Sequence, residues 1–211
     1  MKMENISLAY GDKKILDSFS VEFPQKGKIC LFAPSGAGKT TILHLLCGLI
    51  HPDSGRILET KDKKFSPVFQ EDRLILSLTA QENIEVVLKK KDSSISRELL
   101  FQLGLGGREQ AYPEELSGGM KRRVAIARAL AYGREYPEQA VYLMDEPLKG
   151  LDEKTACQTA EVIDHYCKDS LLIFVSHDRA QAQEMADQML FLEGEPVRIS
   201  KIWHKNKGCT E

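Results

Sequence analysis

One glycine-rich run constrains the fold of this chain more than any other segment. It reads Ala33-Pro34-Ser35-Gly36-Ala37-Gly38-Lys39-Thr40, and it departs from the phosphate-binding pattern G-x-x-x-x-G-K-[ST] only at its first position. An apolar segment, 29–32, precedes the run, and residues 40–49 follow it with apolar side chains at helical spacing. A strand, a tight turn and a helix are the setting in which such a loop holds phosphate, because backbone N–H groups and the helix N-terminus face one anion.

The side chains of this run predict a nucleotide site. Lys39 supplies a positive charge for the β- and γ-phosphates, and the Thr40 hydroxyl is a ligand for Mg²⁺. A glycine-rich turn without a ligand would explain the glycines, but not Lys39 and Thr40 in register with them. We expect the nucleotide to contact Ala33, Pro34, Ser35, Gly36, Ala37, Gly38, Lys39, Thr40 and Thr41.

Ala33 stands where the pattern has glycine. If this position needs a positive φ, alanine strains the loop by about 1 kcal/mol. If its φ is ordinary, the exchange is almost free. The sequence leaves both cases open.

The composition predicts one soluble α/β domain. The chain has 211 residues, 42% of them hydrophobic and 28% charged, with a net charge of −2, so no nucleic-acid surface is expected. No signal-peptide core begins the chain, and no apolar stretch approaches the roughly 18 residues of a membrane helix. The five cysteines form no C-x-x-C pair. Buried free thiols are expected at Cys30 and Cys47, and we expect a cytoplasmic protein.

Alternating strand and helix patterns predict a parallel sheet with helices on both faces. Residues 4–23 read as two strands joined by a turn, and 140–144 and 171–175 as buried strands. Residues 79–103 read as helical, opened by a capping box of Thr79 and Glu82. Ser117 is placed to cap a further helix. In such a sheet, ligands bind at the carboxyl ends of the strands.

Polar residues follow two of these strands. Asp145 and Glu146 come directly after 140–144, where Asp145 can orient Mg²⁺ and Glu146 can act as general base toward water. The alternative is two surface acids that open a helix. His177 follows 171–175 and is placed to hydrogen-bond a γ-phosphate, although a lone histidine is more often structural.

Two further residues are candidates on weaker signals. Gln70 ends a short strand, 67–70, and its amide can bind Mg²⁺ or water beside the site. Tyr10 ends the first strand, where its ring is either a platform for adenine or a core side chain.

A second glycine motif gives the chain a family resemblance. The run Leu116-Ser117-Gly118-Gly119-Met120 and the basic, alanine-rich segment behind it resemble the signature motif of ATP-binding cassette (ABC) ATPases. Over essentially the whole chain, family motifs occur in the family's order: Tyr10, the phosphate loop, Gln70, the signature, Asp145-Glu146, Gly150-Leu151-Asp152 and His177. Met120 stands where glutamine is commoner in the family, which looks like the mark of a subgroup. Two segments, 70–74 and 112–120, are similar to the ATPases of nitrate, sulfonate, taurine and pyrimidine-precursor importers.

The resemblance implies a fold and a set of partners. It implies an α/β P-loop NTPase with a parallel-sheet core, an antiparallel β subdomain and an inserted helical subdomain at about residues 72–130. It implies ATP and Mg²⁺ as ligands, with Lys39, Glu146 and His177 catalytic and Thr40, Gln70 and Asp145 at the metal. Ser117, Gly118 and Gly119 would close over ATP held by a second, identical or different, ATPase protomer. Transmembrane permease subunits and a substrate-binding protein would complete an importer, with this chain on the inner face of the cell membrane.

Two other functions compete with an importer ATPase. An ABC ATPase without a transport role, such as a scaffold in iron–sulfur cluster assembly, would lack the importer-like stretch after Gln70. A small P-loop kinase would need an acceptor site and a lid, and would not need Leu116-Ser117-Gly118-Gly119. The transported molecule is not encoded in this chain's motifs.

Overall fold

The computed structural model describes residues 1–34, 38–205 and, for the backbone alone, 208–210. The strands are β1 (Lys2–Tyr10), β2 (Lys13–Glu22), β3 (Gly27–Phe32), β4 (Ser54–Leu58), β5 (Lys64–Val68), β6 (Ala140–Asp145), β7 (Leu171–Ser176), β8 (Gln188–Glu193), β9 (Arg198–His204) and β10 (Gly208–Thr210). The helices are α1 (Lys39–Leu46), α2 (Ala80–Glu85), α3 (Ser93–Gln102), α4 (Gly118–Arg134), α5 (Glu153–Cys167) and α6 (Arg179–Met185), with a 3₁₀ turn at Pro113–Glu115.

The predicted parallel sheet is confirmed. Its order is β10-β9-β8-β3-β7-β6-β5, in which β8, β3, β7, β6 and β5 run parallel and β9 and β10 add an antiparallel edge. Alternate side chains of each strand enter opposite layers. On β7, Phe174 joins the core under α4, α5 and α6, whereas Ile173 joins the core that contains α1. Burial on both faces explains the uninterrupted apolar strands.

The hairpin expected over residues 4–23 forms a small second sheet. Strands β1 and β2 pair antiparallel, and β4 pairs with the other edge of β1. The inward side chains Met3, Ile6 and Leu16 are fully buried in the core shared with α1. This antiparallel sheet is the β subdomain that the resemblance implied.

The helical prediction over 79–103 is wrong in its continuity. The capping box of Thr79 and Glu82 is present, but α2 ends at Glu85, and α3 begins only after its own cap, Asp92. Tight i→i+3 hydrogen bonds, such as Leu88 N–H to the Glu85 carbonyl, turn the chain between them. The three lysines at 89–91 are exposed and lie in this connection.

The helix predicted from the apolar spacing after the phosphate loop is also longer than the observed helix. Helix α1 ends at Leu46, and Gly48 follows with a φ of 72°. Leu49 therefore lies beyond the helix and is 52% exposed. Positive φ is available to glycine at little cost, which explains the stop.

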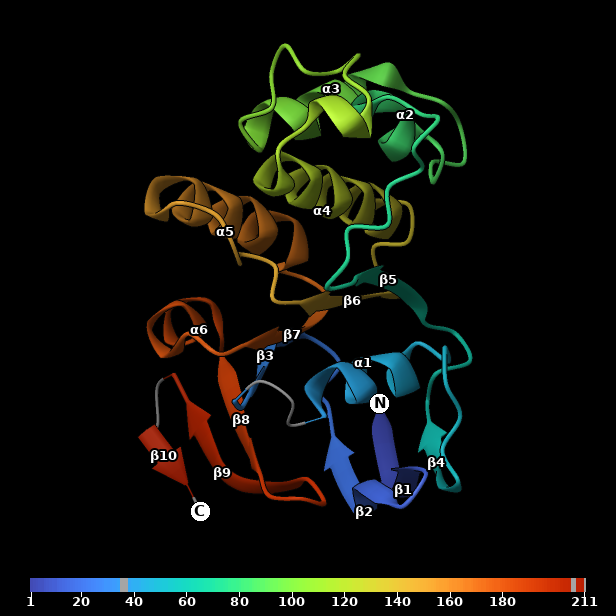
Figure 1. Cartoon of the computed structure of the whole chain (residues 1–211), viewed down its shortest axis with the longest axis vertical. Coiled ribbons are helices and arrows are strands. Elements are labelled where there is room, and N and C mark those ends of the chain that lie inside the picture. Colours follow the sequence, from blue (N-terminus) through green and yellow to red (C-terminus); the bar gives the residue numbers. More distant parts are fainter. Residues whose placement is uncertain (35–37, 206–207, 211) are drawn as a thin grey trace.

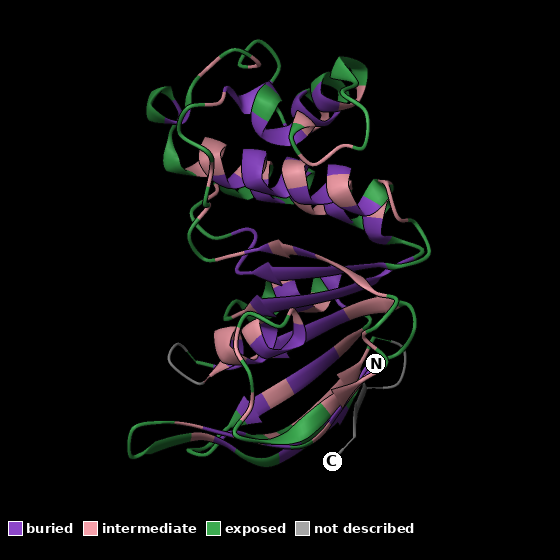
Figure 2. Cartoon of the chain, turned by 90° about the vertical axis from the view of Figure 1, so that its right-hand side faces the viewer, coloured by how far each residue is buried: buried purple, intermediate pink, exposed green. Residues whose placement is uncertain are grey.

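Figure 1 shows the layers along the long axis of the molecule. Helices α2 and α3 lie at one end, followed by α4 and α5 and then by β5, β6 and β7 of the central sheet, while α1 lies nearer the other end, which β1, β2 and β4 share with β9 and β10. Figure 2 shows that the strands of the central sheet are largely buried while the connecting loops are exposed. No helix within the described residues is long and apolar enough to cross a bilayer. Cys30 is a buried free thiol as expected, and Cys47 is half-buried.

Candidate functional site

The sheet order brings the predicted catalytic segments to one edge. Strands β3, β7 and β6 are neighbours and run parallel, so their carboxyl ends meet. The phosphate loop follows β3, His177 follows β7, and Glu146 follows β6. Within the described part of that loop, Gly38 caps α1 with a φ of 72°, in the left-handed region that suits glycine. Its predicted neighbours Ser35, Gly36 and Ala37 lie outside the described residues.

Lys39 is held against its own loop. Its side chain is buried, and its Nζ donates to the Ala33 carbonyl at 2.6 Å and the Pro34 carbonyl at 2.7 Å. Burial lowers the pKa of Lys39, and the charges of Glu146 and Asp145 only partly oppose this. A buried cation held by neutral carbonyls is suited to receive an anion, because phosphate oxygens would supply the opposite charge that it lacks.

The open question about Ala33 is answered by its backbone. Positive φ at non-glycine positions among the described residues occurs at Asn5, Ser18, Glu59, Arg73 and Glu146, and Ala33 is not one of them. The Ala33 side chain is 2% exposed and packs in the core beside α1. Alanine at this position therefore carries no left-handed strain, and its methyl group adds apolar contact.

Thr40 and Asp145 face one another at the start of α1. The Thr40 hydroxyl donates to Asp145 Oδ2 at 2.5 Å, which joins the phosphate loop to the end of β6. Burial raises the pKa of Asp145, and the hydrogen bond from Thr40 only partly opposes this. A buried carboxylate beside a hydroxyl is the hard-oxygen donor set that suits Mg²⁺.

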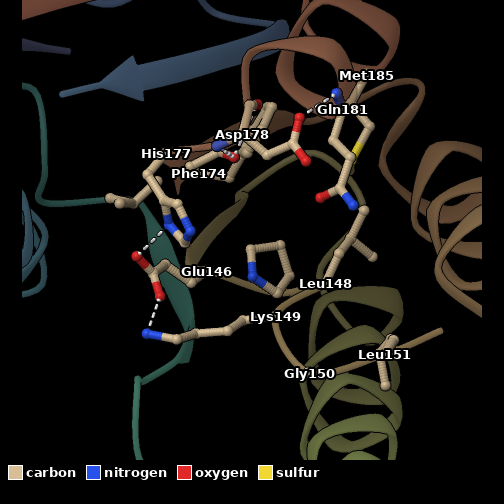
Figure 3. Close-up of a pocket in the computed structure, with 13 residues that line it drawn as sticks. Glu146, Leu148, Lys149, Gly150, Leu151, Phe174, His177, Asp178, Gln181 and Met185 are labelled. Carbon is tan, nitrogen blue, oxygen red and sulfur yellow. Dashed lines mark hydrogen bonds and ion pairs between the residues drawn. The ribbon is translucent and has the colours of Figure 1, made fainter. Parts of the chain in front are cut away.

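Glu146 is bound at both of its carboxylate oxygens (Figure 3). His177 Nδ1 lies 2.9 Å from Oε1, and Lys149 Nζ lies 2.6 Å from Oε2. Glu146 is buried and has a φ of 49°, an uncommon backbone conformation for this residue type. Burial alone would raise the pKa of Glu146, but hydrogen bonds from Lys149 and His177 hold it below its ordinary value. The alternative of two surface acids is excluded, since Asp145 is 3% and Glu146 9% exposed.

A cavity lies beside this cluster (Figure 3). It is lined by the turn that follows β6, by the end of β7 and by α6, and Glu146, Leu148, His177 and Met185 are among its walls. Glu146 and His177 therefore both border this cavity.

Arg122, which the sequence analysis did not single out, positions the backbone of Gln70. The Gln70 side chain is exposed, two residues beyond β5, and its backbone carbonyl accepts a hydrogen bond from Arg122 of α4. Arg122 also donates to the Phe69 carbonyl and forms an ion pair with Asp72 at 3.2 Å between Nε and Oδ1. The signal was available, because Arg122 lies four and eight residues before the buried Ile126 and Leu130.

The signature residues form the first turn of α4. Ser117 caps it, accepting from the Met120 N–H at 3.3 Å, and Ser117 and Gly118 are exposed. A Cβ on Gly119 would lie 3.0 Å from Leu151 Cδ2, so the turn after β6 packs on this helix start. The first N–H groups of a helix have no acceptor within it, so this turn stays the predicted second anion site.

Tyr10 and Ser117 are predicted nucleotide contacts that the structure, over the part of the chain it describes, does not join to Glu146 and its neighbours by a polar contact. Tyr10 is 54% exposed, which excludes the core alternative. Among the described residues, no hydrogen bond or ion pair joins Tyr10 or Ser117 to Lys39, Asp145 or His177. Their contacts with nucleotide stay predictions.

Comparison with known proteins decides the family. The sequence profile described as ABC transporter matches residues 16–149. This chain belongs to the ABC transporter family. It is 36% identical to the "Probable sulfate/thiosulfate import ATP-binding protein CysA" of Chlorella vulgaris, over 93% of this chain and 89% of that protein. It is 32% identical to the "Aliphatic sulfonates import ATP-binding protein SsuB 2" of Rhodococcus jostii (strain RHA1), over 96% of this chain and 82% of that protein.

Solved cassettes share the whole fold. The chain matches the "Dimeric structure of a post-hydrolysis state of the ATP-binding cassette MJ0796 bound to ADP and Pi" with a TM-score of 0.82 and 25% identity, over 97% of this chain and 98% of that one. A second match, the "Dimeric Structure of MJ0796, a Bacterial ABC Transporter Cassette", has a TM-score of 0.83 and 26% identity, over 97% and 98% of the two chains. The predicted fold class is confirmed, and this ABC cassette is an ATPase that binds ATP.

Lys149 is the second residue of this cassette's site that the sequence reasoning missed. The motif shows only a lysine three residues after the candidate base, and such spacing brings two side chains together when the chain turns. A hydrogen bond from the Lys149 N–H to the Glu146 carbonyl, 3.1 Å, closes that turn.

Proposed function

We propose that this cassette is the ATP-hydrolysing subunit that powers a membrane importer. The observation that carries the proposal is the convergence of Lys39, Asp145, Glu146 and His177 at one sheet edge, in a chain whose relatives are named import ATP-binding proteins. The names of those relatives, which specify sulfate, thiosulfate and aliphatic sulfonates, favour the sulfonate branch among the solutes suggested by the motifs.

Binding of ATP begins at Gly38 and Lys39, where the phosphate loop continues into α1. Lys39 exchanges its two carbonyl contacts for phosphate oxygens, while the α1 N-terminus faces the same charge. Thr40, Asp145 and Gln70 are the residues that would hold Mg²⁺, which neutralises charge on the phosphates when bound. Because Thr40 and Asp145 already touch, the donor set needs little rearrangement. Tyr10 is exposed and available to stack on adenine.

Hydrolysis in this proposal uses Glu146 as general base. Its carboxylate takes a proton from water while the water oxygen attacks the γ-phosphorus and the bond to the ADP oxygen breaks. ADP, phosphate and a proton on Glu146 result. His177 positions Glu146 through Oε1 and offers its other ring nitrogen to the γ-phosphate.

The incomplete site explains the need for partners. Ser117, Gly118 and Gly119 form an exposed helix start that, among the residues described, makes no hydrogen bond to Lys39, Asp145 or His177, and this supports closure over ATP held by a second ATPase protomer. The helices α2, α3 and α4, within and just beyond residues 72–130, would form the subdomain that meets a permease. This places the chain in the cytoplasm, held to the membrane through that permease, with a binding protein on the opposite side.

Affinity purification in detergent from the native cell tests the importer assignment. A tag on this chain is expected to recover a multi-span membrane protein together with ATPase activity that Lys39→Ala abolishes. Recovery of soluble partners alone would favour the role of an assembly scaffold instead.

A further inference from the structure

Lys149 contacts the candidate base although the hydrolytic steps above do not need it. Its Nζ lies 2.6 Å from Glu146 Oε2, while the opposite oxygen is occupied by His177 at 2.9 Å. The turn that brings Lys149 back onto Glu146 is closed by the hydrogen bond from the Lys149 N–H to the Glu146 carbonyl. Figure 3 shows the lysine and histidine approaching the carboxylate from two sides.

This contact opposes the proton transfer assigned to Glu146. With His177 at Oε1 and the Lys149 ammonium at Oε2, an attacking water finds neither carboxylate oxygen open to it. The other charged groups that face Glu146 are Lys39 and Asp145. Lys39 has a second task at the phosphates, whereas Lys149 makes no other ion pair among the described side chains.

The Lys149 side chain is also free to leave. It is 48% exposed, whereas Glu146 is 9% exposed, so the lysine can return its ammonium to water with little loss. His177 can keep the carboxylate oriented through Oε1 when this happens. The pair is thus asymmetric, with a fixed acid and a mobile cation.

We infer that Lys149 is a positioning residue that restrains Glu146 in the resting protomer, and that its ammonium must leave Oε2 before this oxygen accepts a proton from water. The inference rests on the proposed function, because it requires Glu146 to be the base. In this role, which we call the brake, Lys149 lowers the basal rate of ATP hydrolysis.

Steady-state ATPase assays on the purified chain over a range of ATP concentrations test this. Lys149→Met, which keeps the length of the side chain and removes its charge, is expected to raise kcat at least about threefold. Its KM for ATP should stay within about twofold of the parent, because the contact that is removed is with Glu146. Lys149→Arg keeps the charge and should stay near the parent. Lys154→Met is the matched control, since Lys154 is exposed on α5 and makes no ion pair among the described residues.

Two results would overturn the brake: a kcat for Lys149→Met equal to or below the parent, or an equal rise in kcat for Lys149→Arg. Thermal unfolding of each variant shows whether a lower rate reflects lost structure, and a folded variant with a lower rate still counts against the brake. The single variant Glu146→Gln, assayed beside Lys149→Met, separates the two proposals. If Glu146→Gln is inactive while Lys149→Met resembles the parent, only the brake fails. If Glu146→Gln hydrolyses ATP normally, the assignment of the base fails.

Discussion

Arg122 binds the backbone of Gln70 directly, so the helix that begins at the signature Ser117 also holds the segment that carries the candidate metal ligand. The Arg122 guanidinium donates to the carbonyls of Phe69 and Gln70, and its Nε pairs with Asp72. Arg122 is 7% exposed, which makes this a desolvated contact rather than a surface pair. Any shift of α4 therefore acts on Gln70.

Replacing Arg122 with Gln should destabilise the fold by about 2 kcal/mol. The shorter, neutral side chain leaves two carbonyls without their donor. It also leaves Asp72, whose pKa burial already raises, without its guanidinium partner. Urea unfolding of the chain without nucleotide measures the change. Arg97→Gln, at an exposed arginine of α3, is the control and should stay within about 0.5 kcal/mol of the parent. An equally small effect of Arg122→Gln would show that the contact contributes little.

Substituting Gly for Ala33 should change ATP affinity by less than about tenfold, or 1.4 kcal/mol. The φ of Ala33 is ordinary, so glycine relieves no strain. The variant should instead lose about 1 kcal/mol of stability, because a buried methyl group disappears and the unfolded chain gains freedom. Calorimetric titration and thermal unfolding give the two numbers. A hundredfold gain in affinity would mean that Ala33 holds the loop in a poor binding state.

The Lys39→Ala variant should lose tight ATP binding while the free protein remains folded. The affinity should fall at least about a hundredfold, or 2.7 kcal/mol, since the buried cation for the phosphates is gone. Stability should change by less than about 1 kcal/mol, because the loss of the donor for the Ala33 and Pro34 carbonyls is offset by the removal of a buried ammonium. Calorimetry and unfolding test both halves, and an affinity within twofold of the parent contradicts the phosphate-loop assignment.

The parts of the site that the sequence predicted are those fixed by strand ends. Asp145 and His177 follow uninterrupted apolar strands, and parallel strands must end at one edge, so their meeting follows from pattern alone. Contacts that depend on the conformation of a turn or on distant backbone groups could not be predicted from the sequence. Lys149 reaches Glu146 only because Glu146 adopts a positive φ and the turn closes on it.

The continuous helix predicted over 79–103 failed for a related reason. Lys89 leaves the helical path to donate to the Glu135 carbonyl at 2.9 Å and to lie over the Tyr136 ring, both 46 residues or more away. The spacing of apolar residues within 79–103 gives no indication of these distant contacts. Local capping by Thr79 and Glu82, in contrast, was readable, since all its groups lie within one turn.

Exchanging Glu146 for Gln should preserve nucleotide binding and abolish hydrolysis. An amide keeps the shape and can hydrogen-bond water, but it cannot take up the proton. Phosphate release measures the loss, and calorimetry the retained affinity. Glu153→Gln, at an exposed acid near the start of α5, should hydrolyse at the parent rate. A Glu146→Gln variant near the parent rate would move the base elsewhere, with His177 the next candidate.

The same variant tests the oligomer. We propose that ATP closes two protomers together and that hydrolysis reopens them, so Glu146→Gln should accumulate as a dimer when ATP and Mg²⁺ are added, as seen by size exclusion. The parent should be monomeric without ATP, and its rate should rise faster than linearly with protein concentration, since in this proposal each site needs the Ser117–Gly119 turn of a second copy. A fully active monomer would contradict this role of the signature, because Ser117 and Gly118 are exposed and outside the hydrogen-bonded cluster of their own protomer.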